Sequence, residues 1–440
     1  MAINRRKRQL LLQITSSLTI MWTLIFQMYG MLFLYAIRRK HMNQRILAYC
    51  GSRRNALFKS LRQKQLCRPL RKKKSIWVKQ GRTDKWWENM ISGLSSSDCW
   101  KKNFRMSKEE FLNLCEELGP FISPNPASPN YRKISLEKKV ALTLYYLKDT
   151  GSIWMTANTF GIHQCTASKV IHEVCSAIKE NLGPKYIYLP RTKSEMEKKV
   201  AQFELKFGMI QAFGCIDGTH IPIKTPPENS QDYFNYKQFH SLNVQAICDY
   251  RGYFIDVECL WPGSCHDAKV FSNSDIVKKM SNKELPETYS SVLPGHEKVP
   301  NYLIGDPAYP LTPNCLKEYE SCKTNAQVIF NNMLRAARNP IECAFGRLKA
   351  RWGILTRKMD LDLIKVPTVI IACFVLHNYC ESNQVYLDEE LERAQIEKNR
   401  ADADIFSNIP DPIYSGTTTE GQEIRDLLTS YISQNLPDSY

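Results

Sequence analysis

The sequence predicts an α/β protein in which a helical region precedes a mixed sheet flanked by helices. Apolar residues recur at helical spacing between about Trp86 and Pro190. From Phe203 to about Glu381, short β-rich runs alternate with helical patterns. The chain has 440 residues, 43% of them hydrophobic, which is enough for two or three domains with buried cores.

The first predicted helices carry recognisable start signals. Ser107 and Glu110 have the spacing of a capping box, in which each side chain bonds the backbone amide of the other residue. Apolar residues then recur at helical spacing through Leu118, and a second helix is expected over Leu136–Leu147.

A helix-turn-helix pattern follows. Met155–Ile162 and Thr166–Ile178 are the expected helices, with Gly161 at the tight turn between them. Ser168 and Lys169 lie on the second helix, where they can reach DNA phosphates. A helical hairpin with no nucleic-acid role has the same pattern, so both interpretations stay open.

The α/β region contains short apolar strands that are followed by carboxylates. Phe213–Ile216 is expected to end at Asp217, and Tyr302–Gly305 at Asp306. Between them, Ser241–Cys248 and Tyr253–Leu260 are expected to form a hairpin. The expected helices are Arg338–Trp352, the buried Val366–Tyr379, and a closing helix over Glu420–Ile432.

Asp217, Asp306 and Glu342 form the strongest candidate site. Strand ends are where ligands bind in α/β sheets, and Glu342 lies on the helix that follows. Three converging carboxylates would repel one another unless they held a hard cation such as Mg²⁺ or Mn²⁺. Such a site can activate water and stabilise the leaving oxygen of a phosphodiester. At least one carboxyl should therefore have a raised pKa in the metal-free protein. Singly, an Asp after a strand is more often a turn or helix cap.

The positive charge of the chain is concentrated at its start. The net charge is +16, and Met1–Thr83 holds 20 of the 60 Lys and Arg residues and none of the 44 acidic ones. This arm suits nucleic acid or an anionic membrane, and Arg71, Lys72, Lys73 and Lys74 are its densest basic run. Leu18–Ile37 is long and apolar enough to span a membrane, or it packs as a partner helix.

Several blocks resemble the PIF/Harbinger transposases and their domesticated relatives, with many motifs in the same order from about Phe104 to His377. The blocks are Cys215–Ile223, Tyr236-Lys237 with Ser241–Ala246, Trp261–Ala268, Gly305–Leu311, Ile341–Trp352 and Val375–Asn378.

The resemblance implies a ribonuclease-H-like fold, catalytic metal-binding acids Asp217, Asp306 and Glu342, and Harbinger-type DDE endonuclease activity on DNA. The family's third block has Arg, three residues, Glu, six residues and Lys, a spacing that Arg338, Glu342 and Lys349 match. The upstream Tyr of the related IS5 pattern would fall at Arg335 and is absent. Pro307 and Ala308 replace a commoner Ser-Gly.

Five supporting residues leave alternatives open. Asp267 could be a metal ligand or an orienting residue, with a structural cap or a supporting role behind the metal ligands slightly favoured. Arg338 and Lys349 could contact phosphates, or belong to a solvated basic helix face. His220, like His266, is expected to hydrogen-bond, because histidine prefers softer metals.

These features predict a metal-dependent DNA nuclease in the nucleus, and also in the cytoplasm. The alternatives are a domesticated DNA-binding or scaffold protein and a membrane-anchored derivative. The resemblance also implies a Myb-like DNA-binding partner, and a homo-oligomer is left open. The expected domains are residues 1–47 (apolar segment), 48–83 (basic linker), 84–195 (helix-turn-helix-like), 200–385 (nuclease) and 386–440 (acidic and polar tail).

Overall fold

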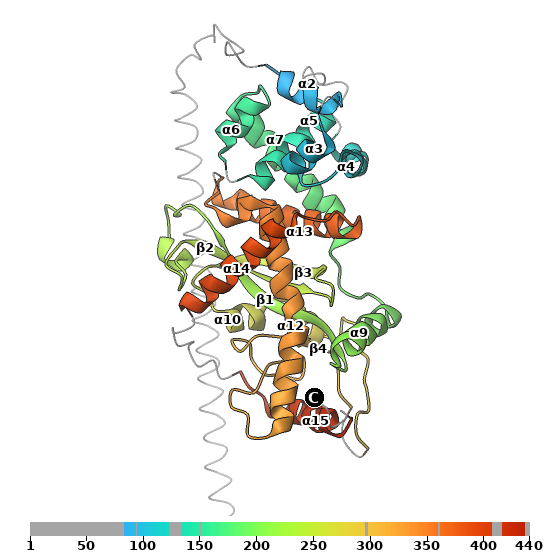
Figure 1. The fold of residues 1–440 in the computed structure, drawn as a ribbon. Helices are drawn as coiled ribbons and strands as arrows, with labels where there is room; N and C mark the ends of the chain where they lie inside the picture. The colour runs from blue at the N-terminus through green and yellow to red at the C-terminus, as the bar shows by residue number, and fades with distance from the viewer. Residues whose placement is uncertain are drawn as a thin grey trace, which may run out of the picture. The chain divides into compact units, whose positions relative to one another are not determined.

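A computed structural model describes residues 83–93, 95–122, 134–149, 151–294, 298–359, 361–406 and 416–435. The apolar segment Leu18–Ile37 and the basic run Arg71–Lys74 lie outside the described residues. Gln80–Tyr440 forms one compact unit. Within it, an α/β region with a mixed sheet follows a helical region, as predicted (Figure 1).

Six helices build the first region: α2 (Lys85–Ile91), α3 (Ser97–Phe104), α4 (Lys108–Ile122), α5 (Leu136–Lys148), α6 (Ile153–Thr159) and α7 (Gln164–Ala177). The capping box is present, since the Ser107 amide donates to Glu110 Oε2 at 2.7 Å and the Glu110 amide donates to Ser107 Oγ at 3.3 Å. Trp100 and Phe104 stack among the buried aromatic rings that hold α2 to α4 together.

Helices α6 and α7 form the predicted helix-turn-helix-like pair. Gly161 has a φ of +64°, and a Cβ on it would lie 2.7 Å from the Thr83 carbonyl oxygen, so the turn requires glycine. Helix α7 begins at Gln164, two residues earlier than expected, because the His163 side chain caps it by accepting from the Cys165 amide. Ser168 is half-buried and Lys169 is exposed.

The chain then passes through a π-helical turn, η1 (Ile178–Leu182), α8 (Gly183–Tyr186) and α9 (Lys193–Phe207) into the sheet. The described strands are β1 (Ala212–Pro222), β2 (Ser241–Cys248), β3 (Phe254–Pro262), β4 (Tyr302–Ile304) and β5 (Cys315–Leu316), in the order β3-β2-β1-β4-β5. Strands β1, β2 and β3 pair antiparallel, and β4 pairs parallel with both β1 and β5.

The predicted hairpin joins β2 to β3. Asp249 shapes its turn, because its Oδ1 accepts from the amides of Arg251 at 2.9 Å and Tyr253 at 3.1 Å. Its Oδ2 lies 2.8 Å from Lys199 Nζ on α9, which ties the turn to that helix.

The expected end of the first strand at Asp217 is wrong. Strand β1 continues to Pro222, since residues from Cys215 to Pro222 pair without interruption with β2. Asp217 therefore lies within a paired strand, opposite Ala246. An Asp-Gly pair usually marks a turn, but the long antiparallel ladder overrides that local preference.

The remaining described helices are α10 (Asp267–Asn273), α11 (Asp275–Ser281), α12 (Asn325–Arg351), α13 (Val366–Ser382), α14 (Glu389–Phe406) and α15 (Thr419–Asn435), with short 3₁₀ turns η2 (Ser230–Tyr233), η3 (Gly353–Thr356) and η4 (Leu363–Lys365). Figure 1 shows α12 as the long orange helix in front of the sheet, with α14 crossing it. Helix α12 begins at Asn325, well before the expected Arg338, and passes through Pro340.

Helix α13 is the buried helix that the sequence predicts. Its segment Leu363–Ser382 is the one described helix long and apolar enough to cross a membrane, and 67% of its apolar window is buried inside the protein. The closing helix is confirmed as α15, whereas α14 was not anticipated.

A buried arginine links the helical region to the α/β region. Arg351 is fully buried and donates to the carbonyl oxygens of Arg105 at 3.2 Å and Val385 at 2.7 Å. Its Nη2 also lies 3.4 Å from Glu381 Oε1. One continuous apolar core extends from the aromatic rings of α2–α4 to the sheet and α13.

Candidate active site

The parallel pairing of β1 and β4 brings two aspartates together. Cys215 lies opposite Ile304 in this register, and an aspartate comes two residues after each of them. Asp217 is therefore in β1 and Asp306 follows the end of β4. The Pro307-Ala308 turn still supports Asp306, because the Ala308 amide donates to its Oδ1 at 3.0 Å.

Asp267 reaches the same place from the first position of α10. Asn243 on β2 orients it, donating through Nδ2 to Asp267 Oδ1 at 2.8 Å. Gly218 leaves the necessary space, since a Cβ there would lie 2.5 Å from Asp267 Oδ1. One carboxylate oxygen from each of Asp217, Asp267 and Asp306 lies within 4.8 Å of the other two.

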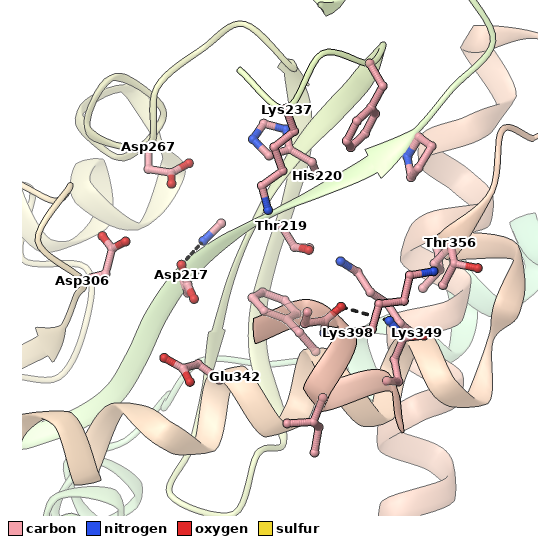
Figure 2. Close-up of a pocket in the computed structure, with 18 of the residues that line it drawn as sticks. Asp217, Thr219, His220, Lys237, Asp267, Asp306, Glu342, Lys349, Thr356 and Lys398 are labelled. Atoms are coloured by element: carbon pink, nitrogen blue, oxygen red, sulfur yellow. Dashed lines mark hydrogen bonds between the residues drawn. The ribbon is translucent and has the colours of Figure 1, made fainter. Parts of the chain in front are cut away.

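Asp267 therefore lies close to the two aspartates that the sequence predicted, and a role as a helix cap alone does not account for its position. Figure 2 shows these three carboxylates together on one side of the cavity. The sequence motif that contains Asp267 was visible, but its distance from Asp217 depends on the β2–β3 connection and could not be obtained from spacing alone.

Glu342 lies on α12 in the same cavity, below Asp217 in Figure 2. Its Oε1 lies 2.7 Å from Arg338 Nη2, one helical turn earlier. It is not among the three carboxylates whose oxygens cluster within 4.8 Å. The structure therefore brings Asp217 and Asp306 together, and places Glu342 beside them in an ion pair.

Burial and the neighbouring aspartates raise the pKa of Asp217, as expected. Burial, followed by the charge of Asp306, raises the pKa of Asp217 well above its usual range, and Asp267 adds to this effect. Arg338 and the Gly218 amide, which donates to Asp217 Oδ1 at 2.7 Å, act in the opposite direction. Although burial lowers the pKa of Arg338, the carboxylates of Asp217, Glu342 and Asp306 raise it. The predicted raised carboxyl pKa is present at Asp217.

Basic side chains line the other part of the cavity, which has a volume of about 940 Å³. In Figure 2, Lys237, Lys349 and Lys398 lie across from the aspartates. Lys349 comes from α12, one of the supporting positions predicted from sequence. Lys398 comes from α14, so the acidic C-terminal stretch contributes a wall that sequence patterns did not indicate.

His220 fits the hydrogen-bonding role predicted for it. His220 Nδ1 lies 3.0 Å from Ser241 Oγ. Burial, with smaller effects from Lys237, Lys349 and His266, lowers the pKa of His220 to about 3, so the ring is neutral at pH 7. His266 is exposed and occupies the N-cap position of α10.

The remaining candidates lie elsewhere. Ser168 and Lys169 are on α7 and do not line the cavity. Arg335, at the position of the missing Tyr, pairs with Glu318 at 2.6 Å.

A family model for the DDE superfamily endonucleases matches residues 216–378, which contain all four acids. The relatives include the Arabidopsis thaliana protein named antagonist of like heterochromatin protein 1, which is 26% identical over 79% of this chain and 87% of its own length. The Arabidopsis thaliana ALP1-like protein is 28% identical over 67% of this chain and 74% of its own length. HARBI1 of Rattus norvegicus, named as a candidate nuclease, is 28% identical over 60% of this chain and 72% of its own length.

No solved structure matches significantly. The mixed sheet flanked by helices and the family match agree with the ribonuclease-H-like fold that the resemblance implied. Residues 216–378 accordingly match the DDE superfamily endonucleases, and the chain as a whole is similar to the ALP1-like and HARBI1 proteins.

Proposed function

We propose that this protein is a metal-dependent DNA endonuclease that hydrolyses phosphodiester bonds with Asp217, Asp306 and Glu342. The observation that supports this most is the cluster of three carboxylate oxygens within 4.8 Å, contributed by Asp217, Asp267 and Asp306. Oxygen donors at this spacing suit hard divalent cations such as Mg²⁺ or Mn²⁺.

The residues fit such an ion. Asp217, Asp306 and Asp267 would hold the ion, and Glu342 would complete the acidic end of the cavity. A bound divalent ion supplies an activated water and stabilises charge on the leaving oxygen. The raised pKa of Asp217 agrees with a site whose carboxylates repel one another until a cation neutralises them.

The chain's own cations would hold the DNA. Lys237 and Lys349 line the cavity, across from the acids in Figure 2, where they can neutralise phosphates on either side of the scissile bond. Arg338 pairs with Glu342 and faces Asp217, so it orients one acid and balances the charge of the other.

The test is plasmid nicking in Mg²⁺ or Mn²⁺. Wild type should nick, whereas Asp217→Asn, Asp306→Asn and Glu342→Gln should not, and Asp267→Asn should be strongly impaired. Asp256→Asn is the matched control, because Asp256 is a partly buried acid on β3 that does not line the cavity. Equal nicking by wild type and Asp217→Asn would reject the proposal.

A DNA-binding or scaffold role without cleavage is the second candidate. The name of the Arabidopsis thaliana relative, an antagonist of a heterochromatin protein, favours this role. Binding of duplex DNA with no nicking under any metal would select it. Co-purification with a Myb-like protein, nuclear imaging and carbonate extraction of membranes would test the partner, the compartment and the role of Leu18–Ile37.

A further inference from the structure

The connection between β1 and β2 places an aromatic side chain at the cavity. Tyr236 lines the cavity that holds Asp217 and remains 48% exposed. Lys237 follows it, with its Nζ 5.6 Å from the centre of the Tyr236 ring. Phe239, from the same connection, also lines the cavity. A large aromatic group is thus presented to the cavity that holds the acids.

Hydrogen bonds fix the backbone that carries Tyr236. Asn235 is buried, its amide donates to the Phe239 carbonyl oxygen at 3.0 Å, and its Oδ1 accepts from the Phe239 amide at 3.2 Å. Asn235 Nδ2 also donates to Ser241 Oγ at 2.8 Å. Residues 235–239 therefore form a closed turn anchored to the first residue of β2.

The same network supports the ring. Ser241 Oγ lies 3.0 Å from His220 Nδ1, and the His220 ring meets the Tyr236 ring edge-on, with centroids 5.4 Å apart at 74°. A supported aromatic side chain loses less conformational freedom when a ligand stacks on it. Tyr236 is consequently organised in advance, although it is half exposed.

The cavity has room for a nucleotide beside the acids. Its volume of about 940 Å³ is at the upper end for sites that hold a drug-sized ligand. The three aspartates inside it are only partly exposed. A nucleotide taken out of the base stack can enter such a recess, as it does in enzymes that act on unstacked nucleotides.

Resting on the proposed function, we propose that Tyr236 is a stacking platform for an unstacked nucleobase next to the scissile phosphate. The ligand is a single unpaired nucleotide of the cut strand. Its base lies against the Tyr236 ring and Lys237 contacts its phosphate. Aromatic stacking accepts any base, because every base has a π-face. The site therefore positions the strand without choosing its sequence.

Tyr188 provides a matched control. It is also 48% exposed and has a cation near its ring, with Arg191 Cζ 5.3 Å from the centroid, but it does not line the cavity. Loss of an exposed aromatic residue in general would affect both positions equally.

The experiment measures binding of the full-length Asp217→Asn protein to short duplexes that the wild type cuts. Each nucleotide around the cut is replaced in turn by 2-aminopurine, which reports stacking, or by an abasic site. At one position, 2-aminopurine should change its fluorescence on binding. Adding Tyr236→Ala should abolish that change and weaken binding by roughly 5- to 150-fold. Tyr236→Phe and Tyr188→Ala should preserve both.

The abasic duplex provides the sharper criterion. At the same position it should weaken the Asp217→Asn protein as much as Tyr236→Ala does, and the two changes together should cost no more than either alone. If the losses of affinity from the abasic site and from Tyr236→Ala multiply, the two act independently and the stacking site is overturned. Loss of binding by Tyr236→Phe would also overturn it. If the wild type cuts DNA, but adding Tyr236→Ala changes neither binding nor 2-aminopurine fluorescence at any nucleotide position, only this inference fails. If the wild type neither cuts nor binds, the proposed function fails with it.

Discussion

Replacing Asp217 by Asn should stabilise the metal-free protein and abolish cleavage. The folded-state pKa of Asp217 is raised, so the stability linked to its protonated form is present at low pH and is lost as the pH rises through that pKa. At pH 7.5 the Asp217 carboxyl of the wild type therefore destabilises the folded state, and asparagine removes this cost. The Gly218 amide can still donate to the asparagine oxygen, because Asp217 accepts it through Oδ1.

The magnitude follows from the carboxylate distances. Two unit charges 4.8 Å apart repel by about 3.5 kcal/mol at an effective dielectric constant of 20. The substitution relieves repulsion from Asp267 and Asp306 and loses attraction to Arg338, which offsets much of the gain. We expect a net stabilisation of about 1–3 kcal/mol, or about 1–4 °C in Tm for a folded unit of this size.

A thermal melt with and without Mg²⁺ measures both consequences. At ten times its Kd, Mg²⁺ should stabilise the wild type by about 1.4 kcal/mol through mass action, and should stabilise Asp217→Asn less. Asp249→Asn is the contrasting control, since Asp249 is buried in a salt bridge and turn network and does not line the cavity. That variant should melt lower, with the Mg²⁺ shift unchanged. If Asp217→Asn melts clearly lower and Mg²⁺ shifts neither protein, Asp217 is structural and the nuclease proposal is wrong.

Three other perturbations have defined outcomes. Burial raises the pKa of Asp256 to about 6, so its protonated form adds stability at low pH that is lost as the pH rises through 6. Asp256→Asn should therefore gain up to about 3 kcal/mol at pH 8 and almost nothing below pH 4, and Tm values that are parallel across pH would contradict this. Arg351→Leu should lower the free energy of unfolding in urea by about 3–5 kcal/mol, because the Arg105 and Val385 carbonyl oxygens lose their donor; a loss under 1 kcal/mol would show that the link is unimportant. Neutralising Arg71, Lys72, Lys73 and Lys74 should reduce the log–log salt slope of duplex binding by about 3.6, and an unchanged slope would show that they do not contact the backbone.

Local patterns predicted much of the helical and hairpin structure. The capping box at Ser107 and the hairpin turn at Asp249 are determined by hydrogen bonds between residues close in sequence, so spacing is sufficient to find them. Helix α13 was equally clear, because a helix that is apolar on all sides within an α/β region is expected to be buried.

Boundaries that depend on distant partners were less predictable. Strand β1 passes through Asp217-Gly218 because β2 supplies a ladder up to Pro222. Helix α14 has a polar, acidic sequence, and its Ile396 packs against Gly346 of α12, where a Cβ would collide with it. No pattern within residues 389–406 reveals the groove that glycine leaves on another helix.

The candidate site was likewise predictable in part. The sequence alone predicted Asp217, Asp306 and Glu342 as the candidate acids, since they occur in motifs whose order resembles a known family. Tertiary structure decided which of them meet: the parallel register of β1 with β4 aligns Asp217 with Asp306, and the space at Gly218 admits Asp267. The packing of the helices also pairs Glu342 with Arg338, and it places α14 along one side of the cavity. Residue types are encoded locally, whereas distances between charges depend on strand register and helix packing, which the whole chain fixes together.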